Sequence, residues 1–480
     1  MKKMLTMIVV LILVTVGASA DTLNLNFSFW GRGVFTPLAF SDGYSSVSAA
    51  TATWNNGAFP RIGFTMNAYH ASRAIGIQIT SFWDGQVPAV GENANIWVRP
   101  LAFLGNENLH DIVEMRLGRW EIDSFRGRIG AVEFGSWIVP DGVQDEDALF
   151  SRFASGTAAH FVIRPLSWWD SPWNGLTLMA GIGSSPGGVR AYMNTYPWNA
   201  RDVYAAGHYA IGYEIPEIGL FRMQFIGNNR PVWVENYPFE GQHGPVRMSQ
   251  GLLMGRDADV LEAAFTFTGV RNLILEAGVK VPFFFVTGLP SYEYYRAVYA
   301  GNAPWATGGL QVYGVHTLEM QFPITVSAGG AFSFGNWSGL LRVDTSFGGR
   351  YHDIGFRDIH EGMAIGVLGS VSHSMTDNVR VGLDVGSNFK EIDTVTHPDG
   401  RTERIGERPT DEETTERRDI GFAPWVQLDF GGGRVRAGIT VMIPSGARWQ
   451  WLGGQAASPF AQVFTGAPVI SFPISVTYSF

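Results

Sequence analysis

The sequence predicts an all-β protein: a transmembrane, antiparallel, up-and-down β-barrel of about 16–20 strands with long extracellular loops. Two observations predict this fold class. Segments in which apolar and polar residues strictly alternate recur along the chain, as in strands whose two faces meet different surroundings. Charged residues make up only 16% of the chain and aromatic residues 13%, whereas ordinary globular chains carry about 25% charged residues. A wall that faces lipid needs few charges, and its aromatic girdles use Trp, Tyr and Phe.

The first 20 residues have the three parts of a secretory signal peptide. Two lysines follow the initial Met, residues 4–16 form an apolar run, and residues 18–20 (Ala-Ser-Ala) are a small-residue cleavage site. We therefore expect residues 1–20 to be removed and residues 21–480 to form a single barrel. No later uninterrupted apolar run approaches the ~18 residues of a transmembrane helix, so strands remain as the way to cross a membrane.

Alternating segments begin with TLNLNFSFW at 22–30, where Leu and Phe share one face and Asn and Ser the other. Segments 260–269 and 272–281 alternate in the same way, and their short link predicts a hairpin with a tight turn at 269–272. Similar segments follow at 339–348, 363–372, 379–388, 421–431 and 434–443, and other candidate strands start near Ile62, Ile75, Ile96, Val113, Ile129, Phe161, Leu176, Tyr209, Phe221, Val312 and Ile324. Counts from the two ends place the turn at 335–337 on opposite sides of the barrel. One strand near 282–300 or 348–361 is therefore missing from the count or superfluous in it.

Long polar connections separate the strands. Residues 390–419 carry ten acidic and six basic residues and almost no apolar ones. This composition is typical of a solvated, mobile segment, and we expect a long extracellular loop there. Residues 141–148 and 227–257 have the composition of further loops. The small, polar stretch 31–60 fits either an outer loop or a segment folded into the lumen.

Charged side chains occur within the alternating strands, opposite the apolar faces. An Arg or Lys that faces lipid at mid-depth costs about 2–4 kcal/mol, so a dozen such charges must face the barrel interior. With about 16 or more strands that interior is too wide for side chains to fill, and water enters. We therefore predict a polar channel lined by Glu114, Arg116, Arg222, Glu262, Glu276, Lys280, Arg342, Asp344, Arg380, Asp384, Arg434 and Arg436.

The arrangement of these charges along the chain predicts a field across the channel. Glu262 and Glu276 belong to one hairpin and are expected on one sector of the wall. Four arginines from C-terminal strands are expected to form one basic patch on another sector: Arg342, Arg380, Arg434 and Arg436. The alternative is that charges of opposite sign pair across the lumen and fill it.

The sequence carries no convergent set of catalytic residues. GSSPG at 183–187 matches the G-x-S-x-G string of nucleophile elbows, but Pro186 follows Ser185 where the motif needs a helix, so a turn is favoured. Two His, two Asp and one Glu lie within 352–361, without the spacing of a metalloenzyme. We therefore expect no enzyme activity, no metal and no cofactor. The chain has no cysteine, and its formal net charge of −9 argues against nucleic-acid binding.

The sequence ends in VISFPISVTYSF at 469–480, with apolar side chains on every second position up to a terminal aromatic. Together with the signal peptide and the alternating strands, this ending resembles the outer-membrane β-barrels of diderm bacteria. In that class such a C-terminus is the signal read by the barrel-assembly machinery, and the matching positions are Ile474, Val476, Tyr478 and Phe480. The resemblance implies a location in the bacterial outer membrane, with membrane lipid and the assembly machinery as partners. A homotrimer is compatible with it.

At this size the resemblance implies a porin-like channel for passive diffusion of small hydrophilic solutes. A second hypothesis is a facilitator for hydrophobic substrates, with residues 31–60 as a hatch in the lumen. Its interior should be largely apolar, and the strand charges argue against that. A third hypothesis is a surface adhesin or structural barrel whose loops bind a partner, which the charged segment 390–419 permits.

Overall fold

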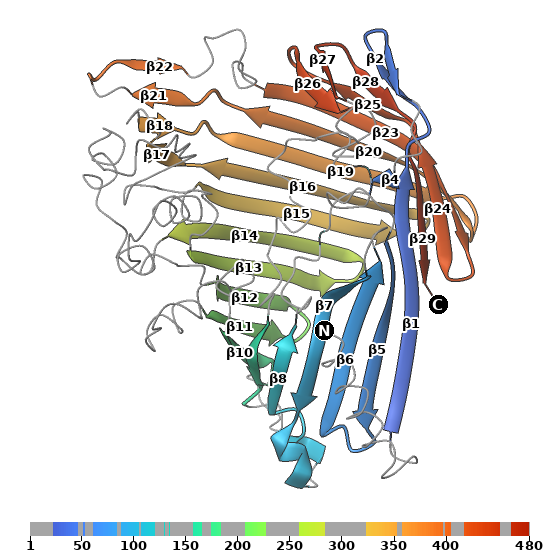
Figure 1. The fold of residues 1–480 in the computed structure, drawn as a ribbon, viewed down its shortest axis with the longest axis vertical. Coiled ribbons are helices and arrows are strands. Elements are labelled where there is room, and N and C mark those ends of the chain that lie inside the picture. Colours follow the sequence, from blue (N-terminus) through green and yellow to red (C-terminus); the bar gives the residue numbers. More distant parts are fainter. Residues whose placement is uncertain are drawn as a thin grey trace, which may run out of the picture.

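The computed structural model consists mainly of β-strands arranged as one curved wall (Figure 1). It describes residues 23–46, 51–52, 61–83, 88–104, 107–120, 129, 134, 157–165, 174–183, 207–226, 259–283, 323–352, 358–396, 399–404, 417–451 and 462–479. The 3-10 helices η2 (Pro100–Leu104) and η3 (Glu107–Leu109) connect two strands. Within these ranges no helix is long and apolar enough to cross a membrane. The expected signal peptide lies outside the described residues.

The wall is a closed antiparallel barrel of 18 strands. Its strands are, in chain order, β1 (Leu23–Phe35), β5 (Arg61–His70), β6 (Ile75–Trp83), β7 (Pro88–Val98), β8 (Val113–Arg119), β9 (Thr157–Ile163), β10 (Leu176–Gly183), β11 (His208–Ile215), β12 (Gly219–Ile226), β13 (Asp259–Val270), β14 (Leu273–Phe283), β15 (Ile324–Phe334), β16 (Trp337–Phe347), β19 (Ala364–Ser374), β20 (Val379–Lys390), β23 (Arg417–Phe430), β24 (Gly433–Gly438) with β25 (Thr440–Ile443), and β28 (Val469–Ser471) with β29 (Ile474–Ser479). Each is paired with its neighbours, and the strand number lies within the predicted range.

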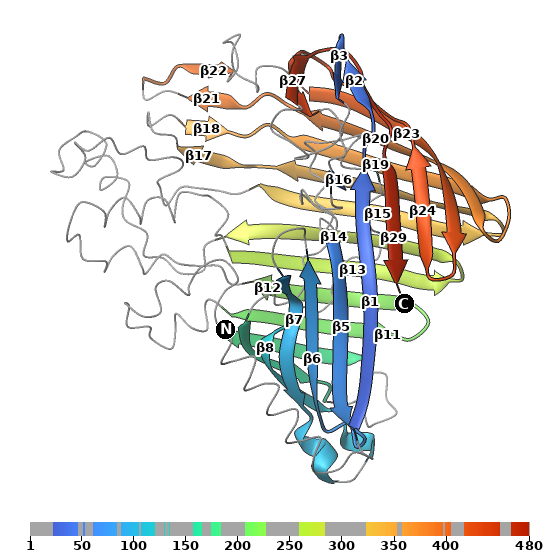
Figure 2. The same cartoon turned by 45° about the vertical axis from the view of Figure 1, so that its right-hand side comes forward.

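The barrel closes where the first strand meets the last. β1 pairs with β29 from Trp30 opposite Ser479 to Phe35 opposite Ile474, and Figure 2 shows the two strands side by side. On the other edge of β1, residues Leu23 to Arg32 pair with the full length of β5. Closure gives the backbone groups of both end strands a partner, which a membrane-spanning sheet requires.

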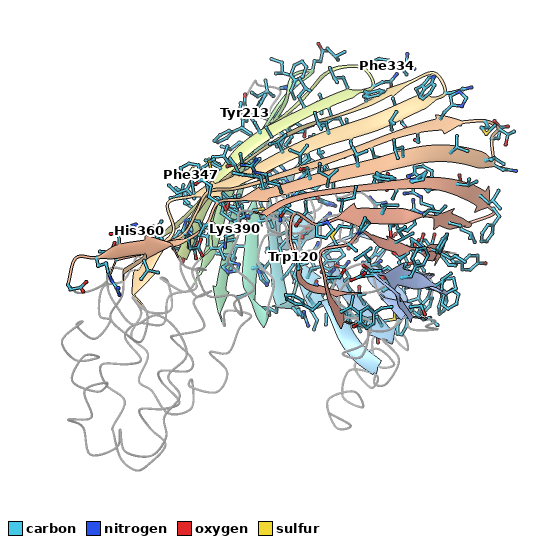
Figure 3. All side chains as sticks on the ribbon, turned by 90° about the horizontal axis from the view of Figure 1, so that it is seen from above. Trp120, Tyr213, Phe334, Phe347, His360 and Lys390 are labelled. Carbon is cyan, nitrogen blue, oxygen red and sulfur yellow. The ribbon has the colours of Figure 1, made fainter. Side chains whose placement is uncertain are left out.

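Side chains alternate between the two faces of the wall. In β12, Arg222 and Gln224 are 2% and 3% exposed, whereas Phe221 and Met223 are each 39% exposed. The outward positions of the other strands likewise carry exposed Leu, Ile, Val and Phe, among them Leu25, Leu341 and Val426. Figure 3 shows Tyr213, Phe334 and Phe347 on the outside of the wall and Trp120 on its concave side. The apolar exterior and polar interior are those of a membrane-spanning barrel.

Short strands extend the wall at one end. β17 (Arg350–His352), β18 (Asp358–His360), β21 (Thr394–Thr396) and β22 (Thr402–Arg404) form a separate antiparallel sheet that continues beyond β16, β19 and β20 (Figure 1). β26 (Arg448–Trp451) pairs with β27 (Gln462–Thr465). β2 (Ala39–Ser41) lies against β28 and folds back as a hairpin with β3 (Tyr44–Ser46), while β4 (Thr51–Ala52) pairs with β1. The described part of 31–60 thus belongs to the wall and its extension.

Several local expectations change. The predicted hairpin is confirmed, with Val270 opposite Leu273 and Asn272 at φ 64° in the turn. Ile129, near which a strand is predicted to start, forms a bend and its side chain is buried; the residues on either side of it lie outside the described ranges, so this strand stays a prediction. The candidate strand near Val312 lies outside the described residues, but β14 is hydrogen-bonded directly to β15. The wall therefore has no strand between β14 and β15, one fewer than the sequence count assumed. With that strand removed, the strand counts from the two ends agree, and the turns after β13 and β15 lie at the same end of the barrel.

The segment 390–419 is less irregular than its composition predicts. β20 runs to Lys390, β21 and β22 form a hairpin within the segment, and β23 already begins at Arg417. Strand formation is possible here because these residues continue wall strands that are already paired, so little extra chain entropy is lost. The extracellular location of the segment stays a prediction.

Candidate functional site: the barrel lumen

A buried charged network joins β12, β13 and β14 on the inner wall. Arg222 forms an ion pair with Glu276, and both side chains are almost fully buried. The guanidinium also donates to the Thr266 hydroxyl (2.6 Å), which in turn donates to the Glu276 carboxylate (2.8 Å). The backbone N–H of Ile129 donates to the other oxygen of Glu276 (3.1 Å). These charges can be buried because each of them has several polar partners.

The second acidic residue of this hairpin lies on the same three strands. Glu262 of β13 is 1% exposed and accepts a hydrogen bond from the Gln224 amide. Lys280 of β14 lies 3.2 Å from the other carboxylate oxygen of Glu262. As predicted, Glu262 and Glu276 lie on one sector of the wall, and each is paired there with a cation.

The inner face of β8 carries a group of ion pairs. Glu114 accepts hydrogen bonds from Arg116 (2.6 Å) and from Arg99 (2.9 Å), which follows β7. Arg116 also donates to Gln78 (3.1 Å), and its guanidinium carbon lies 4.2 Å from the ring centroid of Trp120. Cation–π contact and hydrogen bonding together fix the position of the Arg116 guanidinium.

Two further carboxylates lie on β16 and β20. Asp344 is fully buried and forms an ion pair with Arg342 of the same strand (2.8 Å). Asp384 accepts hydrogen bonds from Ser370 (2.7 Å) and from the indole N–H of Trp425 (2.8 Å). Both acids are therefore held by wall residues on their own or neighbouring strands.

Arginines gather near the seam at which the barrel closes. Arg380, Gln427 and Arg436 are register partners on β20, β23 and β24. Arg436 donates twice to the neutral Gln427 side chain (3.1 and 2.7 Å), and its guanidinium lies 3.9 Å from the Trp425 ring centroid. Two residues along the strands, a second row runs across β23, β24, β29 and β1, and its members are Asp429, Arg434, Thr477 and Arg32. We call Arg32, Arg380, Arg434 and Arg436 the seam arginines.

Arg342 does not belong to this group. It lies on β16 in the row of Leu368 and Gly386, and its ion pair with Asp344 compensates its charge locally. The expectation of one patch of four arginines is therefore wrong for Arg342. Asp344 lies two positions from Arg342, on the same face of β16, so the strand spacing alone could have indicated this pair.

Three described residues that follow β8 in the sequence lie against the inner wall. Trp120 packs against Val162, Met179 and Ala210, which lie on β9, β10 and β11. Ile129 packs against Ala264 of β13, and Phe134 is fully buried against Leu368, Ala423 and Trp425 of β19 and β23. Three described residues of one connection thus contact the inner wall at three separate places, although β8 and β9 are direct neighbours.

Sequence reasoning missed several residues of the lumen. Gln224, Thr266 and Gln427 occupy inward positions of alternating strands, so counting neutral polar residues as well as charges would have found them. Arg32 lies in the stretch 31–60, for which composition predicted either an outer loop or a segment folded into the lumen. Ile129 and Phe134 carry no sequence signal for this role, because only the folded barrel brings them onto distant strands.

The structure describes only some residues of the other predicted sites. Ile474, Val476 and Tyr478 lie on the outward face of β29, while Phe480 lies outside the described residues, so the assembly signal stays a prediction. Ser185 and Asp353 also lie outside them. Among the residues that the structure does describe, no three His, Asp or Glu side chains are grouped as metal ligands would be.

Comparison with known proteins gives matches at the level of structure. No protein-family model and no curated protein sequence matches the chain. The anion-selective porin from Comamonas acidovorans aligns over 95% of this chain and 100% of its own, with 9% identity and a TM-score of 0.44. OmpT, an outer-membrane protein of Vibrio cholerae, aligns over 96% and 99%, with 12% identity and a TM-score of 0.42. OccK5 (OpdH) of Pseudomonas aeruginosa aligns over 95% and 98%, with 8% identity and a TM-score of 0.43.

These identities and TM-scores are too low to transfer any function. The architecture is evident from the molecule itself: a closed 18-stranded antiparallel wall with an apolar exterior and a charged interior. The chain therefore has the architecture of a porin-like outer-membrane β-barrel.

Proposed function

We propose that the protein is a channel of the bacterial outer membrane through which small hydrophilic solutes diffuse passively, with a preference for anions. A barrel of 16–18 strands is wide enough to leave an aqueous passage. We further propose that it has no enzymatic activity. Five of the twelve predicted charged residues are half-buried and would line the passage: Arg116, Lys280, Arg380, Arg434 and Arg436. The other seven are at most 3% exposed, so the expectation that they line the channel is wrong for them, and they shape the wall instead.

The excess of basic over acidic side chains near the seam supports the proposed preference for anions. Glu114, Glu262 and Glu276 each lie against a basic side chain, and Asp344 lies against Arg342. The two rows of the seam hold four arginines and one carboxylate, Asp429. A second carboxylate, Asp384, interacts with the charge of Arg436, and the amide of Gln427 orients Arg436. Four arginines thus stand against two carboxylates. An anion that passes the seam therefore meets a net positive wall.

The test changes the sign of the seam. Arg380, Arg434 and Arg436 are replaced together by Glu, and the reversal potential is measured in planar bilayers under a KCl gradient. We expect a shift toward cation selectivity that is strong near 0.1 M salt and weak near 1 M, where the Debye length falls from ~10 Å to ~3 Å.

The matched control is Arg73→Glu, Arg271→Glu and Arg401→Glu, three exposed positions in turns outside the strands. It changes the net charge by the same amount and should leave the reversal potential in place. If the seam variant inserts normally and its reversal potential at 0.1 M equals that of the control, the seam does not line the conducting path. Absence of conductance in the unmodified barrel would refute the channel itself. Cross-linking in the membrane tests the homotrimer, which stays a prediction.

A further inference from the structure

We propose that the inner faces of β1, β5, β6 and β7, which lie side by side in the wall (Figure 2), form a binding site for a neutral carbohydrate. The inference deepens the proposed function by naming a class of solute, and it rests on that function because the solute must enter the lumen. The inward-facing residues of these four strands carry the inference, and we call them the neutral sector.

The residues of the neutral sector are uncharged and lie in four rows across the strands. Aromatic rings occur in the first and last rows, hydroxyls in the second and amides in the third. The rows are Trp30, Gly63 and Phe82; Ser28, Thr65 and Thr80; Asn26, Asn67, Gln78 and Asn95; and Asn24, Tyr69, Gly76 and Trp97. A solute on these rows meets hydrogen-bond donors and acceptors without ionic side chains, which suits an uncharged ligand.

Two amides of the third row are available to a ligand. Asn26 is exposed and Asn67 half-buried, and no side chain in the described part of the molecule is hydrogen-bonded to either. Gln78 and Asn95, at the other end of the row, already accept hydrogen bonds from Arg116 (3.1 and 3.4 Å), whose charge is compensated within β8. A carboxamide presents a donor beside an acceptor, and two adjacent sugar hydroxyls require this combination.

Two tryptophan rings bound this polar surface, and both lie against glycines of the neighbouring strand. A Cβ at Gly63 would collide with the Trp30 ring, and a Cβ at Gly76 would collide with the Trp97 ring. Both rings are half-buried, so part of each remains accessible from the lumen. A rigid aromatic surface of this kind can bury the C–H face of a sugar ring.

The spacing of the rows favours an oligosaccharide over a single sugar. The first and last rows are six residues apart along β1, which corresponds to about 20 Å at ~3.4 Å per residue. Two aromatic rows at this separation cannot both contact one sugar unit, whereas a chain of several units reaches both. The amides and hydroxyls between the rows then face the hydroxyls of the intermediate units.

Other classes of solute fit the neutral sector less well. An apolar solute would leave its amides and hydroxyls without partners, which costs free energy when they lose water. An anion finds the positive charge that it requires at the seam arginines. A neutral solute rich in hydroxyls satisfies both the polar rows and the aromatic rows.

The experiment measures binding without relying on conductance. The refolded barrel, in a detergent that has no sugar head group, is titrated in a calorimeter with maltotetraose and with cellotetraose, two neutral tetrasaccharides that differ in linkage. Polyethylene glycol of the same hydrodynamic radius is the control ligand, because it lacks hydroxyl donors along its chain. Ion current in planar bilayers is recorded with the same sugars, since a sugar bound in the lumen obstructs the current.

We expect at least one tetrasaccharide to bind more tightly than glucose and to reduce the current. Asn26→Leu with Asn67→Leu should weaken its binding about tenfold, because hydrogen bonds of two amides are lost. Trp30→Ala should weaken it by a similar factor, and Trp30→Phe, which keeps an aromatic face, by less. Thr325→Leu is the matched control: it replaces a half-buried inward residue of β15, on the opposite sector of the wall, and should leave the affinity unchanged.

The proposal is overturned if neither tetrasaccharide binds the unmodified barrel at millimolar concentration, or if polyethylene glycol binds equally well. Binding that stays within about twofold in both the double variant and Trp30→Ala would place the sugar elsewhere and also overturn it. Should the double variant not fold, the single variants Asn26→Leu and Asn67→Leu decide, each with an expected loss of about threefold. Sugar binding by a barrel without conductance would refute the channel and leave the site, whereas conductance without sugar binding would refute the site and leave the channel.

Discussion

The buried ion pair between Arg222 and Glu276 allows a quantitative prediction. Arg222→Met keeps the aliphatic volume of the arginine stem but removes the charge that faces Glu276, whose side chain has no exposed surface. Breaking a buried pair by removing one partner costs about 3–5 kcal/mol, because the remaining charge stays buried without compensation. Thr266 and the Ile129 amide still donate to Glu276, so we expect about 3 kcal/mol, the lower end of this range.

A double-mutant cycle adds the single variant Glu276→Met and the double variant, in which both charges are removed. Replacing a buried pair by apolar residues of similar volume is often neutral or stabilising, so Arg222→Met with Glu276→Met should cost less than Arg222→Met alone. The coupling between the two positions should then exceed about 1.5 kcal/mol, the upper part of the range seen for contacting residues.

The assay is equilibrium unfolding in guanidinium with the barrel in lipid vesicles, followed by the fraction that retains the folded gel mobility. The unmodified barrel, the two single variants and the double variant are measured at one salt concentration so that screening is the same. A loss below about 1 kcal/mol for Arg222→Met, or additive losses in the double variant, would show that water reaches Glu276 and would refute the argument from burial.

Three further substitutions test the wall. Gly382→Ala should destabilise the barrel by about 1–3 kcal/mol, because a Cβ there meets the Trp425 ring. Gly431→Ala, with open space around it, should leave the stability unchanged. Equal guanidinium midpoints for the two variants would contradict this packing. Leu341→Arg puts a charge on an outward side chain that is 54% exposed and should cost about 2–4 kcal/mol at mid-depth, while Leu341→Phe should be tolerated; equal stability of the two would contradict a lipid-facing surface. Asn272→Val should cost about 1–2 kcal/mol at φ 64°, and Asn272→Gly should not; identical unfolding midpoints would argue against that turn conformation.

The alternating pattern of the sequence was enough to predict the class of fold and the direction of most side chains. Alternation with period two fixes which residues share a face of a strand, and the cost of a charge in lipid then decides which face is the interior. This reasoning correctly assigned Arg222, Glu262 and Glu276 to the side opposite the apolar face, and it located the turn at Asn272. These conclusions need only local geometry and solvation.

Which charges from different strands compensate one another depends on the tertiary structure. Arg222 of β12 pairs with Glu276 of β14, and Arg436 of β24 donates to Gln427 of β23. These contacts depend on the register between strands, which is set by pairing around the whole barrel. The positions of Ile129 and Phe134 were likewise beyond sequence reasoning, because their acceptors come from strands more than a hundred residues away and become neighbours only when the wall closes.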